Sequence, residues 1–273
     1  KEATYVKEGK PVLRPEYKPF YQMYEKAGGK YTIRTIGRPD RLFENDGKGH
    51  FRDVTKEAGI EDQAYGLSAT WFDYDGDGLI DIYVNNGGLQ NTLINDVINL
   101  PIFVQFYIAI EPAYNKLFQN NGDLTFSDVT KTSGTEVLGI GSGVGNADLD
   151  DDGFLDLFLT NRTFYNSDKQ ITESDRNYLL RNKGNGNNWI KIELTGTKSN
   201  TNAYGARVKV MAGESIQYRE HTSAHGYNSA NDYRLHFGLA NEESIDSIEI
   251  IWPSGERQLL TDVAVNQTLS IEE

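Results

Sequence analysis

The stretch DYDGDGLIDIYVNN, residues 73–86, places an aspartate at every second position and then continues into an alternating apolar segment. Like charges this close together destabilise a folded chain unless a positive charge lies among them. The pattern therefore predicts a cation bound in this turn. The aliphatic residues Ile80, Ile82 and Val84 recur with a period of two, which predicts a strand with one buried face.

The acidic pattern D-x-D-x-D-G-x-x-D occurs twice, at residues 73–81 and again at 148–156. A second pair of segments keeps the same spacing, with RLFENDGKGHFRDVT at 41–55 and KLFQNNGDLTFSDVT at 116–130. A partial third copy, YLLRNKGNGNNW, begins at Tyr178. Two different motifs that share one spacing indicate duplicated supersecondary units.

Each unit has the signature of short strands joined by tight turns. RLFEN and KLFQN run into Asn-Gly or Asp-Gly turns and are followed by HFRDV and TFSDV, which predicts hairpins. The phenylalanines at repeat positions are expected in the core: Phe43, Phe51, Phe118 and Phe126. Short antiparallel sheets repeated in this way predict β-propeller blades. Two complete units and a partial one are too few for an ordinary ring, so a longer chain, other segments or other subunits would complete it.

The C-terminal third also predicts strands, and the whole chain is expected to be all-β. Apolar residues alternate with polar ones in several segments separated by Gly-rich or Asn-rich turns: Ile190, Ile192 and Leu194, then Val208 and Val210, then Ile248 and Ile250. A compact β-sandwich or small barrel is the packing that these strands favour.

The acidic loops offer only oxygen ligands, which suits calcium better than zinc or copper. Aspartates stand at loop positions one, three, five and nine, and the carbonyl of position seven can complete the shell. The predicted ligands of two calcium ions are Asp73, Asp75, Asp77, Leu79 and Asp81 in one loop, and Asp148, Asp150, Asp152, Phe154 and Asp156 in the other. An EF-hand is excluded because its twelfth position, Val84 or Leu159 here, falls inside a strand. The alternative is a polar Asx-type turn without an ion.

Composition excludes several classes of protein. The 273 residues carry a formal net charge of −13, so nucleic acid and anionic lipid surfaces are poor partners. The absence of cysteine excludes disulfides, thiolate metal sites and thiol catalysis. The longest apolar run, residues 102–110, is too short to span a bilayer. A start at Lys1 is interpreted as a mature or trimmed chain.

No catalytic constellation stands out, and we predict that the chain is not an enzyme. The spacing of His221 and His225 would suit a helical zinc pair, but the surrounding residues do not favour a helix. Ser254 lacks the flanking glycines of a hydrolase elbow, and no phosphate-binding loop occurs. The paired aspartates could in principle serve a glycosidase, but a metal explains them better.

These motifs resemble a known family. The acidic loops and their LF-x-N-x-G…F-x-DVT strands are similar to FG-GAP/VCBS repeats of integrin-α-type propellers, which implies calcium on the loop positions named above. The segments NNWIKIELTGTKSNTNAYGARVKV, GYNSANDYRLHFGLA and IDSIEIIWPSGERQLLTDVAVNQTLSIEE resemble the ASPIC/UnbV domain. That domain follows such repeats in the family of cartilage acidic protein and its bacterial relatives.

We therefore divide the chain into residues 1–40, unassigned; 41–182, the propeller repeats with an insertion at about 90–112; and 183–273, the ASPIC/UnbV-like β-domain. The leading hypothesis is a calcium-binding, non-enzymatic interaction or adhesion module, secreted or at the cell surface or envelope, with a protein or glycan partner. One alternative is a carbohydrate-binding or accessory part of a carbohydrate-active protein. Another is a subunit of a larger cell-envelope assembly, with residues 102–110 buried against a neighbour.

Overall fold

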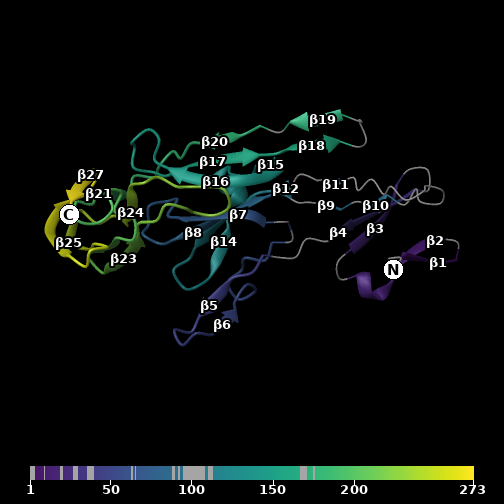
Figure 1. Ribbon diagram of the computed structural model, residues 1–273, viewed down its shortest axis with the longest axis horizontal. Coiled ribbons are helices and arrows are strands. Elements are labelled where there is room, and N and C mark those ends of the chain that lie inside the picture. Colours follow the sequence, from purple (N-terminus) through teal and green to yellow (C-terminus); the bar gives the residue numbers. More distant parts are fainter. Residues whose placement is uncertain are drawn as a thin grey trace.

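The computed structural model describes residues 4–8, 10–18, 21–26, 30–35, 40–62, 64, 66–87, 90–91, 93–94, 108–109, 113–166, 171–174 and 176–273. Strands dominate these residues, whose only helices are a 3-10 turn, η1 (Pro15–Tyr17), and a short α-helix, α1 (Thr130–Ser133). The predicted all-β fold is confirmed. The described helices are all too short to cross a membrane. In Figure 1 the repeat sheets lie between the N-terminal strands and a C-terminal domain.

Two antiparallel sheets form the repeat region, in the orders β14-β13-β8-β7 and β16-β17-β20. Their strands are β7 (Gly66–Phe72), β8 (Asp81–Asn86), β13 (Lys116–Asn120), β14 (Phe126–Asp128), β16 (Gly141–Ala147), β17 (Asp156–Asn161) and β20 (Tyr178–Leu180). One acidic turn joins β7 to β8 and the other joins β16 to β17, and β7 and β16 lie side by side (Figure 1). The two sheets are therefore partial propeller blades, and the described residues form no closed ring.

Another copy of the β13–β14 hairpin precedes the first sheet. Strands β5 (Phe43–Asn45) and β6 (Phe51–Asp53) pair as β13 and β14 do. The bond from the Val54 amide to the Leu42 carbonyl, 2.9 Å, repeats the 3.0 Å bond at the equivalent place after β14. Among the described residues, however, β5 has no further strand on its other edge.

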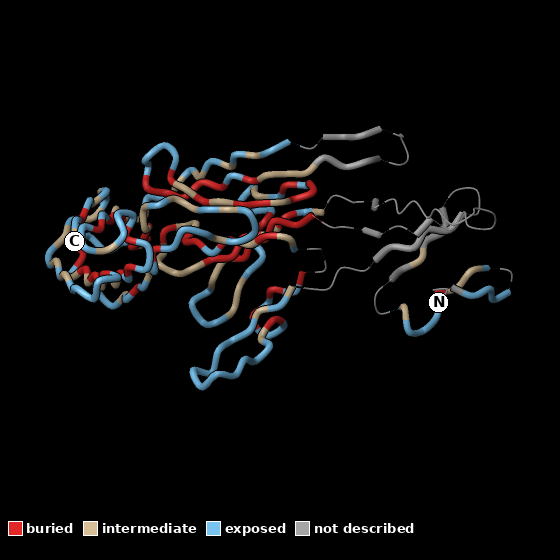
Figure 2. Tube along the Cα trace, viewed as in Figure 1, coloured by how far each residue is buried: buried red, intermediate tan, exposed pale blue. Residues whose placement is uncertain are grey.

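This free edge corrects one expectation from the sequence. Phe118 is only 3% exposed and Phe126 packs partly against the same cluster, as expected. Phe43 and Phe51 are 49% and 66% exposed, so the expectation that they lie in the core is wrong. The reason is that β13 lies against β8, whereas no described strand covers β5. Figure 2 shows this hairpin projecting as a largely exposed tube.

Strand β8 is buried on both faces, not on one as the alternation predicted. Ile82 and Val84 pack with Phe118 in one apolar cluster. Tyr83, which points to the opposite face, is fully buried in a second cluster that includes Leu159 of the neighbouring sheet. A central strand between stacked sheets therefore loses the exposed face that a period of two implies.

The C-terminal domain is a β-sandwich, as predicted. One sheet has the order β24-β21-β27 and the other β23-β22-β25-β26. Their strands are β21 (Asn188–Thr195), β22 (Arg207–Ala212), β23 (Ser215–Glu220), β24 (Leu235–Ala240), β25 (Ser244–Ile251), β26 (Arg257–Ala264) and β27 (Gln267–Glu272). Ile190, Ile192, Val208, Ile248 and other alternating apolar residues of both sheets meet in one core.

The N-terminal segment and the insertion meet through backbone pairing. In residues 1–40 the strands are β1 (Thr4–Lys7), β2 (Lys10–Leu13), β3 (Tyr21–Lys26) and β4 (Lys30–Thr35). The remaining short strands are β9 (Gln90–Asn91), β10 (Leu93–Ile94), β11 (Ile108–Ala109), β12 (Ala113–Tyr114), β15 (Leu138–Gly139), β18 (Thr163–Asn166) and β19 (Ile171–Ser174). Strand β10 of the insertion pairs with β4. Apart from β11, the apolar run 102–110 lies outside the described residues.

The equivalent phenylalanines Phe118 and Phe43 offer a matched test of packing. Phe118→Ala should lower the free energy of unfolding by about 3–5 kcal/mol, because it opens a cavity in a closed cluster. Phe43→Ala, on the free hairpin, should cost less than about 1 kcal/mol. Urea unfolding of both variants measures the difference, and equal losses would mean that β5 is covered in solution.

Candidate metal centre

The first acidic loop is folded by its own carboxylates. The two oxygens of Asp73 accept hydrogen bonds from the amides of Asp77 (3.1 Å) and Gly78 (2.9 Å). Asp81 accepts the Tyr74 amide at 2.9 Å. Gly78 adopts a φ of +90°, which the bend requires and which other residues rarely reach. The Asp and Gly positions of the motif therefore specify the turn itself.

Three carboxylates converge inside this loop. Asp73, Asp75 and Asp81 each place one oxygen within 4.8 Å of the others. Asp73 and Asp81 are 2% and 1% exposed, and Oδ1 of Asp75 is buried without a hydrogen-bond partner. Asp77 lies outside this group, and one of its oxygens accepts the Leu79 amide at 2.8 Å. Ligation by Asp77 and by the Leu79 carbonyl remains a prediction.

Burial makes these carboxylates hard to ionise. Burial, together with the charges of Asp77 and Asp75, raises the pKa of Asp73 to about 7. Burial, together with the charges of Asp75 and Asp73, raises the pKa of Asp81 to about 8. A cation placed among these oxygens would favour their ionised forms. The set of hard oxygen donors, one of them unpartnered, fits calcium.

The second loop repeats the turn. Asp148 accepts the amides of Asp152 (3.1 Å) and Gly153 (2.9 Å), and Asp156 accepts the Leu149 amide at 3.2 Å. The carboxylates that converge here are those of Asp148, Asp150 and Asp152, within 4.8 Å of one another, and Asp156 is not among them. Each loop thus gathers three of its four predicted aspartates, but not the same three.

Phe154, the other predicted carbonyl ligand, is 9% exposed, and its amide donates to Asp152 at 3.0 Å. Ligation by its carbonyl remains a prediction, as does the complete five-residue set at each loop.

An asparagine that sequence reasoning missed closes each loop. The Asn120 amide donates to Asp81 at 2.8 Å, and its side-chain nitrogen donates to the Ile80 carbonyl at 3.0 Å. Asn182 repeats the first bond with Asp156 at 2.7 Å. The sequence contained a signal for this asparagine, because the motifs LF-x-N and LL-x-N carry it at the same place.

Comparison with known proteins agrees with these motifs. Residues 32–84 match the family of FG-GAP-like repeats, and residues 196–273 match the family described as ASPIC and UnbV. The chain carries an FG-GAP-like repeat and an ASPIC/UnbV domain. We use the name ASPIC/UnbV domain below for the β-sandwich of β21–β27.

Cartilage acidic protein 1 is a distant relative. The protein from Mus musculus is 25% identical over 264 residues, which cover 80% of this chain and 38% of that protein. The Xenopus tropicalis protein is 24% identical over 281 residues, covering 85% of this chain and 41% of that protein. The Homo sapiens protein is 25% identical, with coverages of 80% and 38%. The chain thus spans about two-fifths of the length of these relatives.

The ASPIC/UnbV domain lies directly on both acidic loops. A side-chain carbon at Gly238 of β24 would lie 2.1 Å from an oxygen of Asp73, so only glycine fits there. Two residues further along β24, the Ala240 amide donates a hydrogen bond to the Gly76 carbonyl, at 2.9 Å. On the second loop, Nε2 of His236 lies 2.8 Å from the carbonyl of Gly153. One strand therefore contacts both candidate metal loops, a contact that the sequence did not predict.

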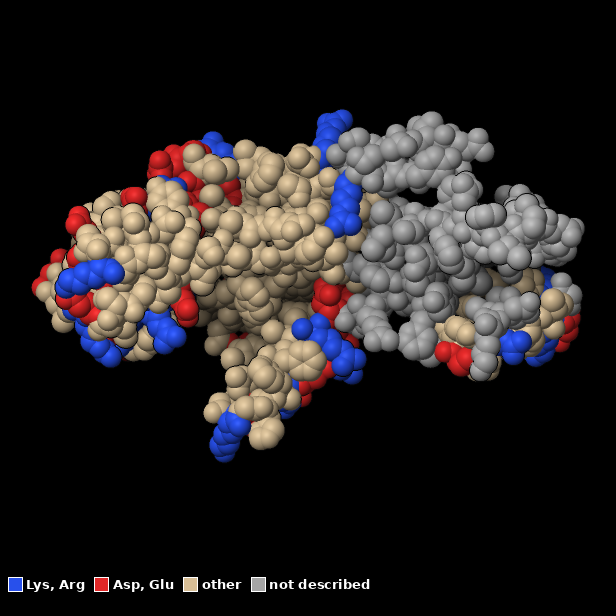
Figure 3. All heavy atoms as spheres, viewed as in Figure 1, with Lys and Arg blue, Asp and Glu red and all other residues tan. Residues whose placement is uncertain are grey.

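Basic side chains surround the second loop. Lys191 of β21, 1% exposed at its side chain, places Nζ 2.7 Å from Asp148 and 2.8 Å from Asp151. Arg234 pairs with Asp151 at 2.7 Å, and Arg181 pairs with Asp150 at 2.5 Å. Figure 3 shows acidic and basic atoms mixed where the blades meet the ASPIC/UnbV domain.

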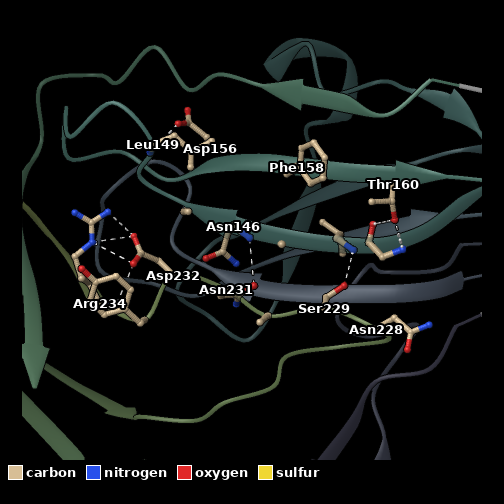
Figure 4. Close-up of a pocket in the computed structure, with 16 residues that line it drawn as sticks. Asn146, Leu149, Asp156, Phe158, Thr160, Asn228, Ser229, Asn231, Asp232 and Arg234 are labelled. Carbon is tan, nitrogen blue, oxygen red and sulfur yellow. Dashed lines mark hydrogen bonds and ion pairs between the residues drawn. The ribbon is translucent and has the colours of Figure 1, made fainter. Parts of the chain in front are cut away.

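A second feature of this interface is a pocket with a largely apolar lining. The segment 221–234, between β23 and β24, runs along β16, where Ser229 accepts the Val144 amide at 3.0 Å and Asn231 accepts the Asn146 amide at 3.2 Å. Between this segment and strands β16 and β17 lies a cavity of about 590 Å³ (Figure 4). His221 and His225 lie in this segment, which is a loop, so the prediction that no helix forms there is confirmed.

Acid should destabilise the fold through the buried ring of His236. Burial lowers its pKa to about 4, whereas an unfolded histidine titrates near 6.5. The unfolded state binds more protons between these values, so stability falls as the pH drops through that window. Between about pH 6.5 and 4.5, the wild type should lose about 2 kcal/mol more unfolding free energy than His236→Gln. Urea unfolding at both pH values measures this difference, and parallel losses would contradict it.

Proposed function

We propose that this chain is a calcium-stiffened, non-enzymatic binding module that acts outside the cell, with its partner a protein or a glycan. The observation that carries the proposal is the convergence of Asp73, Asp75 and Asp81, with one Asp75 oxygen buried and unpartnered. Three carboxylates held this close repel one another when ionised, and a cation among them would relieve that repulsion. Calcium among them would tie the end of β7 to the start of β8, in the loop that β24 of the ASPIC/UnbV domain covers.

An extracellular location would suit such a site. Calcium sites of extracellular modules work at dissociation constants of about 10⁻⁴–10⁻³ M, which match the calcium concentration outside cells. The ion would then be permanently bound and structural. The two domain families found in the chain, and its distant homology to cartilage acidic protein 1, support an interaction module of this kind.

Calcium should raise the thermal stability of the whole chain. At a concentration about 100-fold above the dissociation constant, one bound ion contributes about 2.7 kcal/mol, or roughly 5–10 °C in melting temperature. Chelation should reverse this shift. Asp75→Ala and Asp150→Ala should each reduce the response to calcium, whereas Glu243→Ala, which removes an exposed charge from the ASPIC/UnbV domain, should not. Melting curves that do not change on chelation would contradict calcium binding.

The pocket favours a glycan as the second candidate partner. Phe158 and Tyr233 line it and are 48% and 56% exposed, so each offers an aromatic face beside the amide of Asn228 and the hydroxyl of Thr160. Exposed aromatic surface next to a few polar groups is the composition of many small-molecule sites. In Figure 4 Phe158, Thr160 and Asn228 lie around the same cavity.

A glycan array probed with the full chain tests this candidate. Binding to a defined set of glycans that Phe158→Ala abolishes, and that Phe43→Ala leaves unchanged, would support the pocket. No signal across acidic and neutral polysaccharides, with and without chelator, would leave a protein partner as the proposal. The assembly alternative depends on residues 102–110, most of which lie outside the described part of the chain.

A further inference from the structure

The two acidic loops share one turn but differ in the side chain that precedes the closing asparagine. In the first loop this residue is Gln119, whose amide nitrogen donates to Asp75 at 2.7 Å. In the second loop it is Arg181, whose guanidinium lies 2.5 Å from Asp150 and 3.8 Å from Asp152. A neutral donor in one loop is therefore replaced by a positive charge in the other.

The fourth loop position differs as well. In the first loop it is Gly76, whose carbonyl accepts a backbone bond from β24. In the second loop it is Asp151, which pairs with Lys191 at 2.8 Å and with Arg234 at 2.7 Å. The extra carboxylate of the second loop thus holds two cations beside the cluster.

Among the basic residues at the second loop, Lys191 is the most deeply buried. Its ammonium group is buried and lies 2.7 Å from Asp148, the first aspartate of the loop, whose side chain is fully buried. The equivalent carboxylate of the first loop, Asp73, faces the backbone of Gly238. Arg219 is near enough to favour the charged form of Asp73, but within the described residues no ion pair joins a basic side chain to the first loop.

From these contacts we propose that the two loops bind calcium unequally. The loop at 73–81 is the tight, ion-dependent site, and the loop at 148–156 is largely neutralised by cations of the chain itself. This inference rests on the calcium binding proposed above. Its physical reason is that a divalent ion entering the second loop meets positive charges already in contact with three of the aspartates, Asp148, Asp150 and Asp152.

The exchange of Gln119 and Arg181 gives a reciprocal test. Arg181 is 70% exposed at its side chain, so Arg181→Gln should fold normally, and it gives the second loop the neutral donor of the first. Gln119→Arg gives the first loop the charge of the second. Lys191 is left intact because its burial at the domain contact makes loss of folding the expected result of its substitution. Arg257→Gln is the control, since Arg257 pairs with Glu249 in the ASPIC/UnbV domain, at 3.0 Å.

The measurement is isothermal titration of the chelator-stripped full chain with calcium chloride, in buffer of low ionic strength. The wild type should show one site at least about 10-fold tighter than the other. Asp75→Asn should remove the tight site and Asp150→Asn the weak one. Arg181→Gln should tighten the weak site by about 5-fold or more, Gln119→Arg should weaken the tight site by a similar factor, and Arg257→Gln should change neither.

Each result of this titration supports or contradicts the proposed difference in calcium affinity. Two sites of equal affinity in the wild type would overturn the inequality, and a weak site that Arg181→Gln leaves unchanged would overturn its explanation by the charge of Arg181; the calcium proposal would stand in both cases. No calcium binding in the wild type or in Arg181→Gln would overturn the proposed function and this inference with it. Circular dichroism of each variant shows whether a lost site reflects lost folding.

Discussion

The structure depends on acidic turns that lie between a propeller blade and the ASPIC/UnbV domain. Asp73 accepts two amides of its own turn and at the same time lies against Gly238 of β24. Asp148 repeats the two amide bonds and adds the buried ammonium of Lys191. Carboxylates taken out of water in this way are stable only if hydrogen bonds and a positive charge compensate the loss of hydration.

The buried carboxylates are compensated differently in the two loops. At 148–156 the compensation is built in, because Lys191, Arg181 and Arg234 supply three positive charges. At 73–81 the carboxylates converge without an ion pair from the described residues, and burial raises the pKa of two of them. One loop would therefore join the domains at all times, while the other would do so most firmly when an ion is present.

The surfaces proposed for recognition lie on segments that this junction holds in place. The segment 221–234 leaves the ASPIC/UnbV domain and returns along β16, so the pocket beside Phe158 exists only while blade and domain are in contact. A rigid scaffold that positions irregular segments is the usual arrangement of a binding protein. The free edge of the β5–β6 hairpin is a second exposed feature, and it distinguishes this copy of the repeat from β13–β14.

The sequence by itself determined the local structure: both acidic turns, the hairpins, the strands of the sandwich and the repeat spacing, because these follow from residue type and periodicity over a few positions. Tertiary structure alone decided which of those elements are covered. It exposed Phe43 where its equivalent Phe118 is buried, closed both faces of β8, and placed His236 and Lys191 on the acidic loops. Coverage and charge compensation depend on neighbours more than thirty residues away in the sequence. No local pattern predicts which segment packs against a given element.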